Sequence, residues 1–76
     1  MTQSRARTTG RRRPVAEAVA EAERRSTTAA RLSELSCHTS AAVRTAVAEN
    51  PACDDETVVL LARDAKELVR LSAAGN

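Results

Sequence analysis

The chain has 76 residues, a formal net charge of +2 and no aromatic side chain. A chain of this length forms at most one small domain, near the lower limit for a core that is stable without metals, disulfides or partners. Its two glycines exclude a glycine-rich phosphate-binding loop, and no apolar run is long enough to span a membrane.

The apolar residues are mainly alanine, leucine and valine. Alanine and leucine have the highest helix propensities, and small side chains allow helix axes to approach closely. No segment shows the alternation of a strand. The sequence therefore predicts an all-α protein with a thin core.

Positive charge is concentrated at the N-terminus. Residues 1–13 contain five arginines and no acid, so the rest of the chain has a net charge of 2 − 5 = −3. So few apolar residues cannot offset the entropy lost on ordering, and we expect a disordered tail. The tail could bind nucleic-acid phosphates, or it could only solubilise the chain or fold onto the acidic body. Its arginines are Arg5, Arg7, Arg11, Arg12 and Arg13.

The next segments show helical spacing and helix-capping residues. Residues 14–25 carry a narrow apolar stripe behind Pro14, which suits a first helical turn. Glutamates in this stretch are incompatible with a signal peptide, so we expect a reduced, cytoplasmic protein. Thr28 is expected to cap the following helix. The helix after that is expected to end at Asn50, in the left-handed conformation that asparagine tolerates before proline.

The last two helices are expected to follow Asp54 and Asp64. Asp54 or Asp55 offers an N-cap before an apolar run, and Asp64 begins a capping signal. We place Leu68 and Val69 on the inward face of the last helix.

The segment Val43–Asn50 repeats as Val69–Asn76, which gives a repeat offset of 69 − 43 = 26 in the numbering. Two short helices in a repeat of this length indicate a solenoid. We divide the helical-repeat domain, 14–76, into a capping helix (14–25), a first repeat (28–50) and a second repeat (54–76). The predicted fold is a short α-α superhelix of about two helix-pair repeats with an N-terminal capping helix.

Residues 28–76 resemble the variant leucine-rich repeat, a relative of HEAT-type helical repeats. One repeat contains Leu61-Ala62-Arg63-Asp64, Val69-Arg70 and Asn76. The preceding one contains Leu35, Val43-Arg44, Ala48 and Asn50-Pro51. His38 departs from the pattern, which has an acid there. The resemblance implies a structural ladder in which Asp64 lies between Arg44 and Arg70.

Few residues are candidates for catalysis or metal binding. Cys37, His38, Cys53 and Asp54 have the wrong spacing for a compact zinc site, so the cysteines are interpreted as small buried hydrophobes. Adjacent residues on a helix point about 100° apart, so Ser36, Cys37 and His38 cannot form a nucleophile–base pair. We expect no enzyme activity and no cofactor or metal.

A small protein-interaction module, an adaptor or scaffold, is the leading functional hypothesis. Leu60 and Leu71 remain after the inward positions are assigned, so we expect a partner-binding or self-association surface at the C-terminal end. The alternatives are a nucleic-acid-associated protein acting through the arginine tail and a truncated remnant of a longer repeat array.

Overall fold

The computed structural model describes residues 15–76, which are helical and contain no strand. Of the first helix, the structure describes residues 15–23. It is followed by α2 (Ala29–Leu35), α3 (Ala41–Glu49), α4 (Asp55–Leu61) and α5 (Glu67–Ala74). The expectation of an all-α fold is confirmed. The predicted tail, its five arginines and Pro14 lie outside the described residues.

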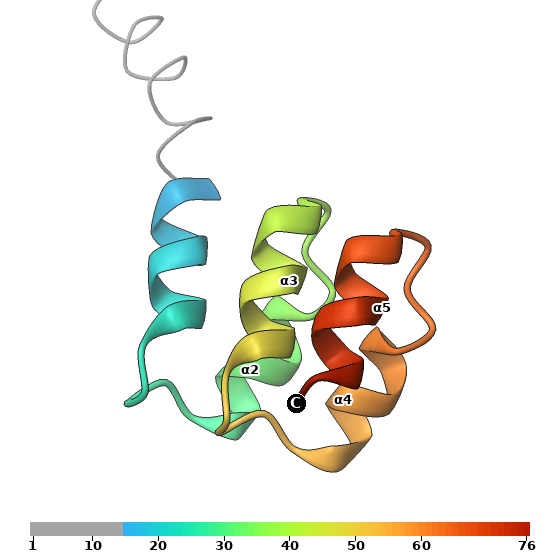
Figure 1. The fold of residues 1–76 in the computed structure, drawn as a ribbon. Helices are drawn as coiled ribbons and strands as arrows, with labels where there is room; N and C mark the ends of the chain where they lie inside the picture. Colours follow the sequence, from blue (N-terminus) through green and yellow to red (C-terminus); the bar gives the residue numbers. More distant parts are fainter. Residues whose placement is uncertain (1–14) are drawn as a thin grey trace, which may run out of the picture.

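The helices form two layers (Figure 1). Helix 15–23, α3 and α5 stand side by side in one row, and α2 and α4 lie behind them. Within this arrangement α3 is central, because it packs against α2, α4 and α5. The pairs α2–α3 and α4–α5 are called the first and second helix pairs below.

Helix 15–23 corresponds to α3 and α5, the second helices of the two pairs. Its last residue, 23, corresponds to Glu49, the last residue of α3, by the repeat offset, since 49 − 26 = 23. In space it also continues the row made by α3 and α5 (Figure 1). The segment expected to be a capping helix therefore occupies the same place in its layer as α3 and α5.

The first helix of each pair begins at a side-chain cap. The Thr28 hydroxyl accepts a hydrogen bond from the Arg31 amide, and the Asp54 carboxylate accepts one from the Thr57 amide. Each cap satisfies an amide that has no partner within the helix. Both expected caps are confirmed, and because they are separated by the repeat offset (54 − 28 = 26), they set the two pairs in register.

The prediction that Asp64 caps the last helix is wrong. The residue at the N-cap of α5 is Lys66, which makes no side-chain capping bond. The Asp64 carboxylate instead accepts from the Lys66 amide within the turn. Asp64 is held there because its carboxylate also meets an arginine of the preceding pair, as described below.

The core is a thin layer between the two rows of helices. Its fully buried large side chains come from all four of α2, α3, α4 and α5. They are Leu32, Leu61, Val43, Val47 and Val69. Ala18 and Ala22 of helix 15–23 complete this cluster, so the first helix shares the core of the repeat.

Candidate functional site

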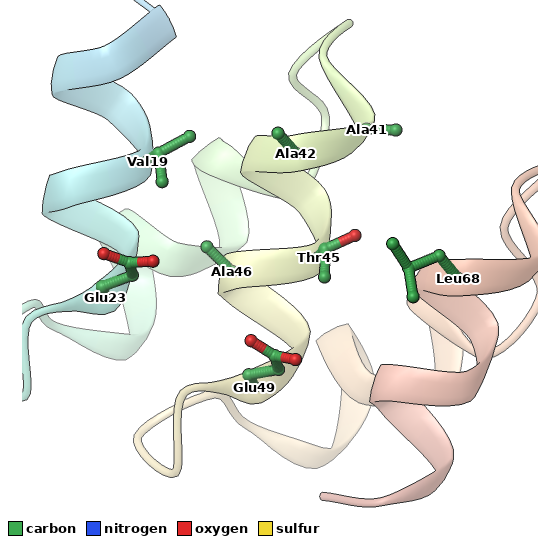
Figure 2. A pocket seen from close by; sticks show the side chains of 8 residues that line it. All are labelled: Val19, Glu23, Ala41, Ala42, Thr45, Ala46, Glu49 and Leu68. Carbon is green, nitrogen blue, oxygen red and sulfur yellow. The ribbon is translucent and has the colours of Figure 1, made fainter.

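An open groove crosses the row of helices over α3 (Figure 2). Its volume is about 400 Å³, which falls in the range of small-ligand and side-chain pockets. Val19 of helix 15–23 and Leu68 of α5 stand on its two sides. The remaining lining residues are Glu23, Ala41, Ala42, Thr45, Ala46 and Glu49.

The floor of the groove is low because the side of α3 that lines it carries small residues. Ala41, Ala42, Thr45 and Ala46 follow helical spacing on this side, while Val43 points into the core and is fully buried. Longer side chains on α3 would fill the space between Val19 and Leu68. The shape of the groove is therefore set by the alanines and the threonine of α3.

Two carboxylates lie at one end of the groove. Glu23 and Glu49 are equivalent by the repeat offset, since 49 − 23 = 26, and Figure 2 shows both beside Ala46. Arg25 lies with them around an adjoining hollow of about 270 Å³. Within the described residues neither glutamate forms an ion pair. This end of the groove therefore has a net negative charge.

Thr45 places an unsatisfied hydroxyl beside the groove. Its oxygen is buried and has no hydrogen-bond partner among the described residues. Figure 2 shows the hydroxyl directed toward Leu68. Leaving a buried hydroxyl without a partner costs about 1–3 kcal/mol, so this position is not optimised for stability.

The ladder residues Arg44 and Asp64 meet between the two helix pairs. Arg44 donates from Nε to Oδ2 of Asp64 over 2.7 Å and from Nη2 to Oδ1 over 3.2 Å. Their side chains are only 16% and 9% exposed. The hydrogen bonds from Arg44 lower the pKa of Asp64, so the carboxylate stays ionised at neutral pH.

Arg70 does not reach the Asp64 carboxylate. Its Nη1 donates instead to the backbone carbonyls of Asp64 and Ala65, over 2.7 and 3.2 Å. Nη1 of Arg44 makes the same contacts one pair earlier, with the carbonyls of His38 and Thr39 over 2.8 and 3.0 Å. Each arginine thus holds the turn of its own pair, and Arg44 also binds the following pair.

His38 occupies in the first pair the position that Asp64 occupies in the second. Its Nδ1 accepts from the Ser40 amide over 3.0 Å, as Oδ1 of Asp64 accepts from the Lys66 amide over 2.9 Å. The residue equivalent to Arg44 one pair earlier is Ala18, since 44 − 26 = 18. Alanine presents no guanidinium, so an acid at position 38 would have no arginine to pair with.

Two asparagines form a second ladder, which sequence reasoning missed. Nδ2 of Asn50 donates to the carbonyls of Ala22 and Arg24, each over 2.8 Å. Asn76 donates in the same way to the carbonyls of Ala48 and Asn50, over 2.6 and 3.0 Å. Each amide therefore fastens the end of one pair to the end of the pair before it.

The expected left-handed conformation of Asn50 is wrong. Its φ is −82° and its ψ is 124°, and the described residues contain no non-glycine residue with a positive φ. The extended backbone lets Oδ1 accept from the Ala52 amide while Nδ2 binds the preceding layer. The repetition of asparagine at the repeat offset was the available signal for this contact.

The C-terminal helix pair exposes large apolar side chains. Leu60 and Leu71 are each 62% exposed. Leu68, placed on the inward face by the sequence analysis, is 63% exposed and forms one side of the groove. Its neighbour Val69 is fully buried, because adjacent residues on a helix point about 100° apart and only Val69 faces the core.

The cysteines differ in their surroundings. Both are free; Cys37 is exposed and Cys53 is buried. The expectation that both are buried is therefore wrong for Cys37, which lies in the turn after α2. Burial raises the pKa of the Cys53 thiol and makes it less reactive. Within residues 15–76 no three His, Cys, Asp or Glu side chains are grouped as metal ligands.

Fold and contacts together define a class of protein: an α-helical repeat in which arginine and asparagine side chains join successive pairs. Residues 41–65 match the family model of the leucine rich repeat variant. This stretch spans α3, α4 and the turn that holds Asp64, and the match confirms the resemblance to the variant leucine-rich repeat family. Comparison with curated proteins and with solved structures found no match. None of the described helices is long and apolar enough to cross a membrane.

Proposed function

We propose that this protein is a small protein-interaction module that binds a peptide segment in the groove over α3. The observation that carries the proposal is the groove itself, an apolar channel between Val19 and Leu68 with two carboxylates at one end. Repeat proteins commonly bind partners along the surface that their stacked helices form.

The lining of the groove specifies the kind of segment that fits. The small side chains of α3 leave room for one apolar side chain, such as leucine, between Val19 and Leu68. Glu23 and Glu49 favour a lysine or arginine near that anchor. We therefore expect a segment that combines an apolar anchor with a basic residue.

Peptide selection on the 76-residue chain tests this function. A displayed library of random peptides should yield sequences that pair a large apolar residue with lysine or arginine. Ala42→Arg blocks the groove from an exposed position and should abolish binding, and Glu49→Gln should weaken it. Ala30→Arg, an equally exposed alanine on α2, is the matched control and should bind normally. Peptides that lack basic residues, or that bind Ala42→Arg as well as the control, would contradict the proposal.

Nucleic-acid binding through the arginine tail is the second candidate function. It is supported by the +5 charge of residues 1–13, since closely spaced arginines bind phosphates and release counterions. The carboxylates of the groove would repel a phosphate backbone, so the tail would have to supply the affinity. Mobility shifts of a DNA duplex that weaken with salt, and vanish when residues 1–13 are deleted, would support this function.

A further inference from the structure

The groove over α3 extends along the axis of that helix. Its lining residues on α3 run from Ala41, the first residue of the helix, to Glu49, the last (Figure 2). A helix of nine residues is about 13 Å long, so the groove follows α3 for about two and a half turns. Helix 15–23 and α5 stand on its two sides. A rod-shaped ligand that fills the groove therefore lies along α3.

The floor of the groove offers few partners to the backbone of a bound segment. Ala41, Ala42 and Ala46 present methyl groups, and Thr45 adds a single hydroxyl. Residues 15–76 contain no strand, so an extended segment finds no sheet edge with which to pair. An extended segment would lose the hydration of its amides and carbonyls here without gaining partners, whereas an α-helix satisfies these groups internally. The floor therefore favours a helical ligand.

The small side chains of α3 also leave room for a second helix. Ala42 and Ala46 are one turn apart and lie on the same side of α3. The distance between two packed helices depends on the side chains at their contact, so alanines allow a close approach. Val19 and the exposed Leu68 stand higher on the two sides, where they can contact apolar side chains of the incoming helix.

Charge at one end of the groove selects the direction of such a helix. Glu23 and Glu49 lie at the end where α3 finishes. The last carbonyls of α3 add partial negative charge at the same end, whereas the first turn of a helix carries partial positive charge. A bound helix is therefore favoured when its N-terminus points toward the two carboxylates, which makes it antiparallel to α3.

The lean of helical side chains fixes where a basic residue must stand. Side chains on a helix lean toward its N-terminus, so those of an antiparallel ligand lean toward Glu23 and Glu49. Thr45 and Glu49 are four residues apart, so an anchor level with Thr45 lies about one turn from the carboxylates. A basic residue four positions before the anchor covers that turn. One placed four positions after the anchor lies over Ala41 and leans away.

We infer that the ligand of the groove is an amphipathic α-helix that lies antiparallel to α3 and carries a lysine or arginine four residues before its apolar anchor. This inference rests on the proposed function and adds the conformation, direction and residue order of the bound segment. The anchor fills the space between Val19 and Leu68. Its basic side chain binds Glu23 and Glu49, which form no ion pair within the described residues.

Two peptides of identical composition and opposite order test the direction on the 76-residue chain. Each is built from alanine and glutamine, has about 16 residues so that it is partly helical in water, and carries lysine and leucine four positions apart at its centre. By fluorescence anisotropy, the peptide with lysine first should bind about fivefold more tightly. Equal affinities, or tighter binding with leucine first, would overturn this inference and leave the groove function standing. Binding of neither peptide would overturn both.

A proline between the lysine and the leucine tests the bound conformation. Proline in a helix interior removes a hydrogen bond and clashes with the preceding turn, so we expect affinity to fall at least about tenfold. The same proline at the first position of the peptide, where a helix tolerates it, is the matched control and should bind normally. Unchanged affinity with the central proline would show an extended ligand and would overturn the inference.

Replacing the carboxylates tests what sets the direction. In the double variant Glu23→Gln and Glu49→Gln, the difference between the two peptides should fall to about twofold or less, because the negative charge is lost with little change of shape. Glu56→Gln, at an exposed glutamate of α4, is the control and should keep the full difference. A double variant that also keeps the full difference would overturn the assignment of direction to these carboxylates.

Discussion

The two helix pairs share their register, caps and hydrogen bonds, yet they are buried to different extents. The first pair lies between helix 15–23 and the second pair, so Leu32, Ala48 and Asn50 are all buried. Among the described residues the second pair packs mainly against the first, and its equivalents Val58, Ala74 and Asn76 retain exposed surface. Burial in this repeat is therefore determined by the number of neighbouring layers.

This difference predicts that equivalent substitutions are more costly in the first pair. Leu32→Ala removes a fully buried side chain surrounded by other layers, and we expect a loss of about 2–5 kcal/mol in unfolding free energy. Val58→Ala removes a half-buried side chain and should cost about 1 kcal/mol. Urea denaturation of both variants measures the two losses, and equal losses would contradict the comparison.

The two asparagines should show the same difference, with a larger loss of stability on removing Asn50 than on removing Asn76. Asn50→Ala leaves the carbonyls of Ala22 and Arg24 without their amide donor in a buried site, and should cost about 2–3 kcal/mol. Asn76→Ala breaks the same bonds where water can replace the amide, so about 1 kcal/mol is expected. Hydrogen exchange should show helix 15–23 loosening in the first variant and α5 in the second. A larger loss for Asn76→Ala would contradict this gradient.

The ion pair of Arg44 with Asp64 should contribute more to the unfolding free energy than the more exposed ion pair of Arg31 with Glu21. Asp64→Ala removes the carboxylate that binds Nε and Nη2 of Arg44, a side chain that is only 16% exposed, and we expect a loss of about 1–3 kcal/mol. Glu21 pairs with Arg31 at a site that is 31% and 46% exposed, so Glu21→Ala should cost less. If Asp64→Ala leaves the melting temperature unchanged, the arginine–aspartate ladder has no structural role.

The Asp64 pair also predicts a pH dependence. Arg44 lowers the pKa of Asp64 in the folded state below its unfolded value, so the unfolded chain binds the proton more readily. The resulting stability is fully present above the unfolded pKa, near 4, and is lost as pH falls through the lower folded pKa. Melting temperature measured between pH 7 and 2 should fall less steeply in Asp64→Ala than in the native chain.

A gain in stability is expected at Thr45, between the groove and α5. Thr45→Val replaces a buried hydroxyl that lacks a partner among the described residues, and should raise the unfolding free energy by about 1 kcal/mol. Thr39→Val, at an exposed turn position, is the control and should change little. Equal effects in thermal melts would indicate that the Thr45 hydroxyl is satisfied by water.

The smallest effect is expected from removing the N-terminal tail. Residues 1–13 contain five arginines and few apolar groups, so they can contribute little to a packed core. A chain that begins at Pro14 should keep its helicity and melt within about 2 °C of the full chain. A larger fall would show that the tail packs against the repeat body.

Short sequence patterns predicted the helices and their caps but missed some of the contacts between helix pairs. Thr28 and Asp54 were recognisable as caps because a cap depends on the three residues that follow it. Asn50 was misinterpreted as a left-handed helix end, because its actual partners, the carbonyls of Ala22 and Arg24, lie far away in the chain, in the layer before it. The resemblance to helical repeats indicated the contact of Asp64 with Arg44, which no local spacing implies.

The sequence by itself determined the helical class, the repeat offset and the caps that set the register. These features depend on propensity and on neighbours within a few residues, which the chain order specifies directly. Only the tertiary structure decided that Leu68 forms one side of a groove and that Arg70 binds backbone carbonyls of its own turn while Arg44 also binds the Asp64 carboxylate. Those properties depend on which layers are adjacent in space, because a side chain's burial and partners come from residues a full repeat away.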